Sequence, residues 1–171
     1  MLNSEKMVAS IGNQDLDRAD KYFKKALRED PAEVLVELGQ YLESIGFLPQ
    51  AQEIYEKVRF DFPEVNVNLA QIAAEDGDIE EAFLYLDVIP EDSDDYLSAL
   101  IVKADLYQME GLTDVARDKL LEASQLSDDS LIIFGLAEME FELGNFEQAI
   151  HYYAKLDNRD LLAMTGVSTY E

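Results

Sequence analysis

The side chains best suited to chemistry in this sequence include a single histidine. His151 lies in the segment AIHYYAKL, and the chain has no second histidine and no cysteine that could complete a metal-ligand set. Acid–base catalysis needs a partner that positions the histidine. A partly exposed structural histidine is therefore the better interpretation, and we predict no catalytic residue at this position.

Two acidic clusters have the composition of calcium-binding loops but not their spacing. They are EDGDIEE at 75–81 and EDSDD at 91–95. A calcium loop of the EF-hand type needs glycine at its sixth position, and counting from the first aspartate of each cluster gives Glu81 and Leu97 there. The clusters are better explained as helix caps and solvated turns, so we predict no metal site.

Motifs of the common enzyme classes do not occur in this chain. It contains no phosphate-binding glycine loop, no zinc-protease motif and no nucleophile elbow. We therefore predict a protein that is not an enzyme and that uses no cofactor.

The net charge of the chain limits the kinds of molecule that it can bind. Thirteen Lys and Arg stand against 37 Asp and Glu, which gives a formal net charge of −24. This charge repels the phosphate backbone that dominates nucleic-acid affinity, so we expect no nucleic-acid partner. The first 28 residues differ, with six basic and four acidic side chains. An electrostatic partner of the remaining, acidic body should be basic.

Targeting and membrane signals are also missing. The N-terminal segment MLNSEKMVASIG has no apolar core of the kind found in signal peptides, and the apolar run LIIFGLA at 131–137 is far shorter than a membrane span. The lack of cysteine fits a reducing compartment. We expect a soluble, cytoplasmic protein without membrane insertion.

Small residues recur with an internal period of about 31 to 34 residues, which is typical of repeat folds. One column consists of alanines: Ala19, Ala51, Ala82, Ala116 and Ala149. A second column lies twelve residues before four of them: Gly39, Ala70, Ala104 and Ala137. A third column, of glycines, lies five residues before the same four: Gly46, Gly77, Gly111 and Gly144.

The columns predict a helix hairpin in each unit. Apolar residues recur at spacings of three and four on both sides of each glycine, as expected for two amphipathic helices. The glycine should sit where the first helix ends, because it adopts the left-handed conformation without a Cβ clash. Gly39 and Ala51 should face each other where the two helices approach closely, with Tyr55 filling the space beside them.

Helix start signals follow at the expected places. The signals are Pro49 at a first turn, capping boxes formed by Asp78 with Glu81 and Asn145 with Gln148, and Asp30-Pro31 with Glu33 opening the second unit.

Small residues are expected to face each other within a unit, and a larger side chain follows one helical turn later. A proline lies near the end of some units (Pro31, Pro63). This pattern resembles the tetratricopeptide repeat (TPR) family. The resemblance covers nearly the whole chain. It implies an all-α, right-handed solenoid of about five helix-turn-helix repeats plus a terminal helix. The expected single domain, 1–171, consists of units at about 1–31, 32–63, 64–96, 97–129 and 130–157, with 158–171 as the start of a sixth unit and the whole as the front part of a longer chain.

In such a solenoid the first helix of each hairpin lines the concave, partner-binding side. The residues expected there are acidic or apolar, with a few glutamines: Glu33, Val36, Gln40, Glu43, Val67, Gln71, Glu75, Ile101, Asp105, Gln108, Phe134, Glu138, Phe141 and Glu142. Members of the family that grip the C-terminal carboxylate of chaperones use Lys, Arg and Asn at such places. None occurs here, which argues against that mode of docking.

Two functions remain open at this point. In one, the chain is a scaffold or adaptor whose groove binds a basic or amphipathic segment of another protein. In the other, it is an assembly element that self-associates, or whose own longer chain fills the groove. A basic stripe of Lys21, Lys24, Lys25 and Arg28 lies along one predicted helix. It is either a solvated face or a surface that docks on acidic side chains, of a second copy or of the partner.

Overall fold

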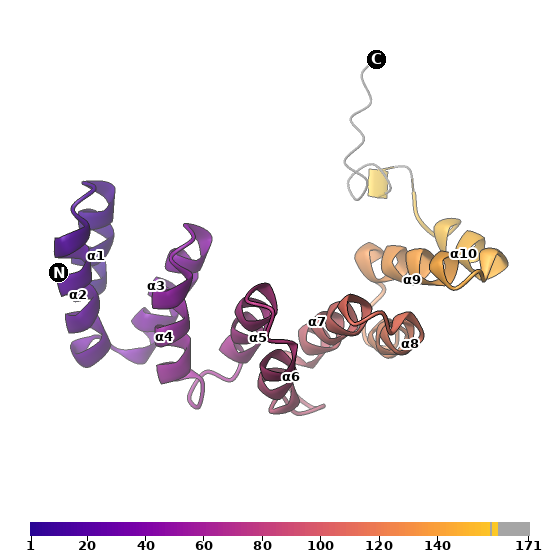
Figure 1. Cartoon of the computed structure of the whole chain (residues 1–171), viewed down its shortest axis with the longest axis horizontal. Helices are drawn as coiled ribbons and strands as arrows, with labels where there is room; N and C mark the ends of the chain where they lie inside the picture. The colour runs from indigo at the N-terminus through magenta and orange to yellow at the C-terminus, as the bar shows by residue number, and fades with distance from the viewer. Residues whose placement is uncertain (158, 161–171) are drawn as a thin grey trace, which may run out of the picture. The chain divides into compact units, whose positions relative to one another are not determined.

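The computed structural model describes residues 1–157, 159 and 160. Within these residues every element of regular secondary structure is an α-helix (Figure 1). Their bounds are α1 (Asn3–Gly12), α2 (Leu16–Glu29), α3 (Ala32–Ser44), α4 (Leu48–Val58), α5 (Val65–Glu75), α6 (Ile79–Asp87), α7 (Tyr96–Met109), α8 (Thr113–Ser124), α9 (Ser130–Glu142) and α10 (Phe146–Tyr153). The predicted all-α fold of five hairpins is confirmed. The predicted sixth unit falls almost wholly outside the described residues.

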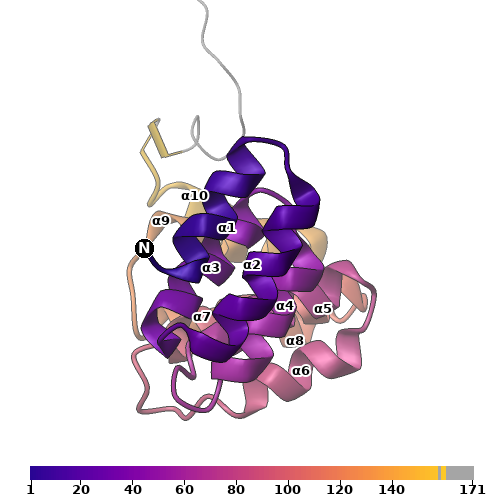
Figure 2. The same ribbon diagram turned by 90° about the vertical axis from the view of Figure 1, so that its left-hand side faces the viewer.

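The helices form two compact units, Met1–Val88 and Ile89–Glu171. In the first unit, α1 packs on α2, α3 on α4 and α5 on α6, and α4 also contacts α5 (Figure 2). In the second unit, α7 packs on α8 and α9 on α10, and α8 joins the two hairpins by its contact with α9. The expected single array across both units stays a prediction.

The turn inside each hairpin has the predicted left-handed residue. Gly46, Gly77, Gly111 and Gly144 have φ angles between +78° and +86°. The first hairpin lacks this glycine, and Gln14 adopts a φ of 59° in its place, five residues before Ala19. The same turn therefore forms in all five hairpins, with a side chain that prefers other conformations in the first one.

An aromatic ring leaves no room for a side chain at Gly39. A Cβ atom at this position would lie 2.7 Å from Cε1 of Tyr55 and 3.2 Å from Cγ2 of Ile54. The fully buried Tyr55 ring therefore fills the space beside Gly39, as predicted, and the close approach of Gly39 to Ala51 stays a prediction. The hydroxyl of the same ring donates a hydrogen bond to Oε2 of Glu43, at 2.6 Å, which fixes the ring over the glycine.

Tyrosine hydroxyls donate to glutamates at further places in the described chain. Tyr85 of α6 donates to Glu56 of α4, and Tyr96 of α7 donates to Glu122 of α8 at 2.5 Å. The hydrogen bond to Glu122 and partial burial raise the pKa of Tyr96 to about 12. These bonds tie neighbouring helices together with a neutral donor and a charged acceptor.

The helix start signals are only partly as expected. Pro49 lies in the first turn of α4, and the Asp78 carboxylate caps α6 by accepting the N–H of Glu81 at 3.0 Å. Asn145 precedes α10 but forms no side-chain cap, and its side-chain N–H donates to Oε2 of Glu140 at 2.7 Å. Glu140 is buried, and Asn145 together with Arg117, whose Nε lies 3.6 Å from Oε1, offsets the cost of burying its charge.

Asp30 also acts differently from the prediction. It was expected to open the second unit, but its carboxylate accepts the backbone N–H and the hydroxyl of Ser4, at 2.7 and 2.5 Å, and two weaker bonds from Asn3. It therefore caps α1, the other helix of its own hairpin. Burial alone would raise its pKa, but the hydrogen bonds from Ser4 and Asn3 outweigh it and lower the pKa of Asp30 below its ordinary value.

Replacing Gly39 by alanine tests the contact with Tyr55. Although alanine favours a helix, Gly39→Ala should lower the free energy of unfolding by about 1 to 3 kcal/mol, because a buried ring must shift. Gly12→Ala is the matched control, since nothing lies within 4 Å of a Cβ there and no loss is expected. Urea unfolding followed by circular dichroism measures both, and equal effects would contradict the assigned packing.

Replacing Asp30 by asparagine tests the cap on α1. Asp30→Asn should lower the free energy of unfolding at pH 7 by roughly 0.5 to 1 kcal/mol. Because the folded pKa lies below the unfolded one, this difference should be complete above a pH of about 4 and vanish as the pH falls through the folded pKa. Unfolding of dilute samples across this range measures it, with the exposed Asp61→Asn as control. A difference independent of pH would rule out the charged cap.

Candidate protein-binding surface

The second unit contains a hollow of about 490 Å³ between α7, α8 and α9. Six residues predicted for the groove line it: Ile101, Asp105, Gln108, Phe134, Glu138 and Glu142. Eight further residues complete its wall: Leu97, Leu120, Ser127, Asp129, Leu131, Ile132, Gly135 and Met139. We call this site the acidic hollow, because no basic residue is found among the described residues that line it.

Helical spacing brings the predicted residues together. Asp105 follows Ile101 by four residues on α7, and Glu138 follows Phe134 by four residues on α9, so each pair lies on one face of its helix. Because α8 packs against both helices, these two faces border the same hollow. The apolar residue of each pair stands one turn before the acidic one.

Gly135 was missed by the sequence analysis although it shapes the wall. A Cβ there would lie 2.8 Å from Cδ1 of Leu120, a buried side chain of α8 that also lines the hollow. The glycine therefore leaves room for Leu120 beside α9. A glycine outside the three columns and inside a predicted helix was the available signal, since it costs helix stability without serving a turn.

One side of the hollow is fixed by an aromatic contact. Phe134 meets Tyr153 of α10 edge to face, with ring centroids 6.2 Å apart and an interplanar angle of 68°. The Tyr153 hydroxyl donates to Glu138, and burial together with this carboxylate raises the pKa of Tyr153 to about 12. The three side chains hold one another, so an apolar and an acidic group face the hollow from defined positions.

Most carboxylates of the hollow already have hydrogen-bond donors. Asp129 caps α9 by accepting the N–H of Leu131 at 2.8 Å. Glu142 accepts the side-chain amide of Gln108 at 3.2 Å and the hydroxyl of Thr113 at 3.5 Å. These contacts lie within the second unit and orient its acidic groups without neutralising them.

Asp105 has no such donor. No hydrogen bond or ion pair reaches its carboxylate from the residues that the structure describes. The side chain is exposed to solvent at the mouth of the hollow, yet the surrounding walls remove part of its hydration and raise the pKa of Asp105 above its ordinary value. A cation placed in the hollow would offset this cost.

Groove residues predicted in the first unit serve partly as structure. The Glu43 carboxylate accepts bonds from Tyr55 and, at 2.9 Å, from the amide of Asn68 on α5, so it joins two hairpins. Val36 is buried and Val67 is half-buried. The other four are exposed on α3 and α5: Glu33, Gln40, Gln71 and Glu75. Their role in binding stays a prediction.

Phe141 and His151 lie outside the acidic hollow. Phe141 does not line the hollow, since its exposed ring packs edge to face on Phe146 with centroids 5.4 Å apart. His151 is exposed on α10 beside Tyr152, at 5.9 Å between ring centroids. Within the described residues there is no group of three His, Cys, Asp or Glu side chains placed to hold a metal ion.

Comparison with known protein families decides the class of this molecule. Models of tetratricopeptide repeats match residues 9–33 and 36–96, and a model described as "YpiA-like, tetratricopeptide repeats" matches residues 108–161. Together these stretches cover most of the chain. The chain belongs to the tetratricopeptide repeat family. Proteins of this family generally act as protein–protein interaction modules rather than as enzymes.

One similar tetratricopeptide protein is the TPR repeat-containing protein YpiA of Bacillus subtilis (strain 168). It is 28% identical over 161 residues, which represent 94% of this chain and 37% of the relative. The chain therefore spans little more than a third of that protein.

Solved structures support the tetratricopeptide fold. A MamA protein superposes with a TM-score of 0.71 at 19% identity, over 99% of this chain and 96% of that one. A thermophilic TPR protein of Thermus thermophilus gives a TM-score of 0.61 at 22% identity, over 90% and 87%. PilF of Pseudomonas aeruginosa gives 0.68 at 17% identity, over 98% and 76%. No described helix of this tetratricopeptide chain has the length and apolarity needed to cross a membrane.

Asp105, which has no partner among the residues that the structure describes, allows a test of stability. Its folded pKa is raised, so the charged form is disfavoured in the folded state, and the penalty applies above the folded pKa. Asp105→Asn should therefore leave the free energy of unfolding at pH 7 unchanged or raise it, within about 0.5 kcal/mol because solvent screens the group. Urea unfolding measures the change. A clear loss of stability would mean that Asp105 holds the fold together.

Proposed function

We propose that this chain is a non-enzymatic binding module whose acidic hollow takes a basic, partly apolar segment of a protein. The observation behind the proposal is the Asp105 carboxylate, which lacks a donor among the described residues and borders a hollow whose wall also contains Ile101 and Phe134. A lysine or arginine from a partner would supply the missing charge. Apolar groups beside it would cover Ile101 and Phe134.

Charge supports a basic partner. Asp105, Glu138, Glu142 and Asp129 border one hollow in a protein with a net charge of −24. Their summed potential attracts cationic segments and speeds encounter, and it weakens beyond a Debye length of about 8 Å at physiological ionic strength. The acidic groups therefore determine mainly the rate of association and the choice of partner.

The apolar wall supports retention of the bound segment. Leu131 is 66% exposed, and Phe134, Ile101 and Leu97 are half-buried around the same hollow. Covering such surface contributes about 25 cal/mol per Å², although ordering the partner offsets much of it. We expect a micromolar affinity, about −8 kcal/mol, for a short segment.

Peptide binding tests the proposed function. The probe is a fluorescent amphipathic helix built from leucine and lysine, and its counterpart with glutamate in place of lysine is the negative control. Fluorescence anisotropy should show micromolar binding of the basic probe only. Asp105→Lys should slow association and weaken binding about tenfold, whereas Phe134→Ala should mainly speed dissociation.

A matched charge change outside the hollow controls for general attraction. Glu110 is exposed at the end of α7 and does not line the hollow. Glu110→Lys changes the net charge as much as Asp105→Lys does and should leave the affinity within about twofold. Equal weakening by both changes, or none by either, would remove the hollow as the binding site.

A further inference from the structure

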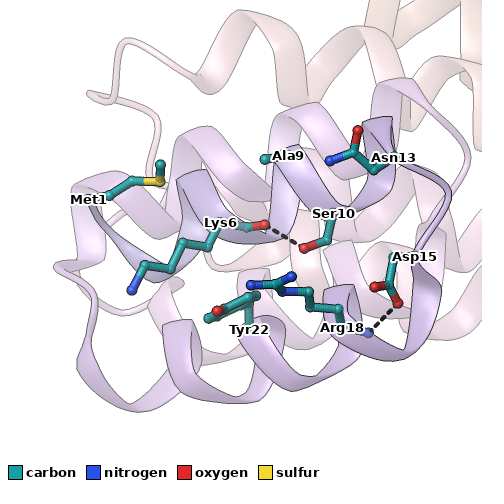
Figure 3. A pocket seen from close by; sticks show the side chains of 8 residues that line it. All are labelled: Met1, Lys6, Ala9, Ser10, Asn13, Asp15, Arg18 and Tyr22. Carbon is teal, nitrogen blue, oxygen red and sulfur yellow. Dashed lines mark hydrogen bonds between the residues drawn. The ribbon is translucent and has the colours of Figure 1, made fainter.

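The first hairpin presents a surface of opposite charge. The Nζ atoms of Lys6 and Lys25 lie 5.5 and 5.8 Å from the ring centroid of Tyr22, and Cζ of Arg18 lies 5.8 Å from it. Lys21, on the same helix, adds to the positive potential at the Tyr22 hydroxyl. We call these five residues the Tyr22 face. Figure 3 shows Lys6 of α1 and Arg18 of α2 beside Tyr22, at a pocket of about 340 Å³.

The cations of the Tyr22 face are only partly compensated by their neighbours, and Asp15 attracts Arg18 electrostatically. Within the described residues none of the four forms an ion pair, whereas the neighbouring Lys24 pairs with Asp20 at 2.9 Å. Asp15 at the rim of the pocket accepts the backbone N–H of Arg18 at 3.1 Å and so serves as the cap of α2. Four like charges around one ring therefore gain from an external group of carboxylates.

A macromolecular partner suits this face better than a small anion. Lys21 and Arg18 are exposed to water, where a single ion pair contributes little. Several carboxylates held on one surface would bind the four cations together, and the entropy cost of association would be incurred once rather than for each separate ion. The partner should thus be a structured acidic surface.

Such a surface is present in the same sequence. The acidic hollow combines Asp105, Glu138 and Glu142 with apolar walls, which is the complement of a helix that presents lysines around an aromatic ring. The Tyr22 side chain is half-buried and amphipathic, so its ring can cover apolar surface while its hydroxyl remains hydrated. Lys21 and Lys25 stand one turn apart on α2, where Lys25 lies over the ring and Lys21 acts electrostatically on its hydroxyl.

We propose that the Tyr22 face of one copy of this chain docks into the acidic hollow of a second copy. This inference rests on the proposed function of the hollow and names its partner. The contact joins two different surfaces, so a pair of copies leaves the hollow of one and the Tyr22 face of the other free, and the assembly grows head to tail. Repulsion between two copies of net charge −24 is screened beyond about 8 Å at physiological salt, which leaves the local attraction to decide.

Sedimentation velocity of the whole chain tests the docking. At about 0.15 M salt the weight-average sedimentation coefficient should rise with protein concentration, and at about 0.5 M salt the rise should disappear. The double variant Lys21→Glu, Lys25→Glu should weaken self-association about tenfold or more. Lys57→Glu, an exposed change on α4, is the control and should associate like the wild type.

Mixing two variants makes the test specific to the pair of surfaces. The second variant, which we call hollow-reversed, carries Asp105→Lys and Glu142→Lys, replaces two of the four carboxylates that line the hollow by cations, and should also fail to self-associate. A mixture of the face-reversed and hollow-reversed proteins should associate again, because the native face of one meets the native hollow of the other. A wild-type protein that stays monomeric at all concentrations, or a mixture that does not associate, overturns the proposal.

The proposal and the proposed function can fail separately. A monomeric wild type whose hollow still binds the leucine–lysine probe would reject self-docking and retain the binding module. If such a monomer also bound a polyglutamate peptide through Lys21 and Lys25, the Tyr22 face would serve an acidic segment of another protein, and the second copy would be excluded as its partner.

Discussion

Each hairpin depends on the close approach of its two helices. The alanine of the first column is at most 3% exposed in all five hairpins, so no larger side chain fits there without moving a helix axis. The contact between the two helices of a hairpin buries one face of each helix. In the second unit it leaves the faces of α7 and α9 with Ile101, Asp105, Phe134 and Glu138 free to border a hollow.

The sequence predicted those parts of the fold that local conformation decides. A left-handed turn favours glycine so strongly that four hairpin turns could be located from their spacing alone. The partners of polar side chains were less predictable. Asp30 bonds to Ser4 across 26 residues, and Asn145 turns away from its helix end to the buried Glu140, because unsatisfied polar groups elsewhere in three dimensions compete for the same donors and acceptors.

In the candidate site, too, features of a single helix were predictable from the sequence, whereas contacts between helices were not. Helical phase alone placed Asp105 and Phe134 among the residues that line the hollow, whereas its wall also needs Leu120 and Gly135, whose contact depends on how α8 meets α9. Glu43 had the right phase for a groove but became a structural acceptor because Tyr55 and Asn68 lie within reach. The phase of a helix therefore does not by itself separate a structural carboxylate from one that has no donor within the described residues.

The tyrosine–glutamate hydrogen bonds allow this protein to be strongly acidic and still be cross-linked. With 13 basic against 37 acidic residues, ammonium and guanidinium donors are too few to hold every structural carboxylate. A phenol is neutral, so mobile ions compete with it less than with a salt bridge, and its raised pKa keeps it protonated in alkaline solution. For the proposed cationic partner, a rise in ionic strength would therefore weaken binding while the hydrogen bonds between the helices persist, so binding could be changed without unfolding the protein.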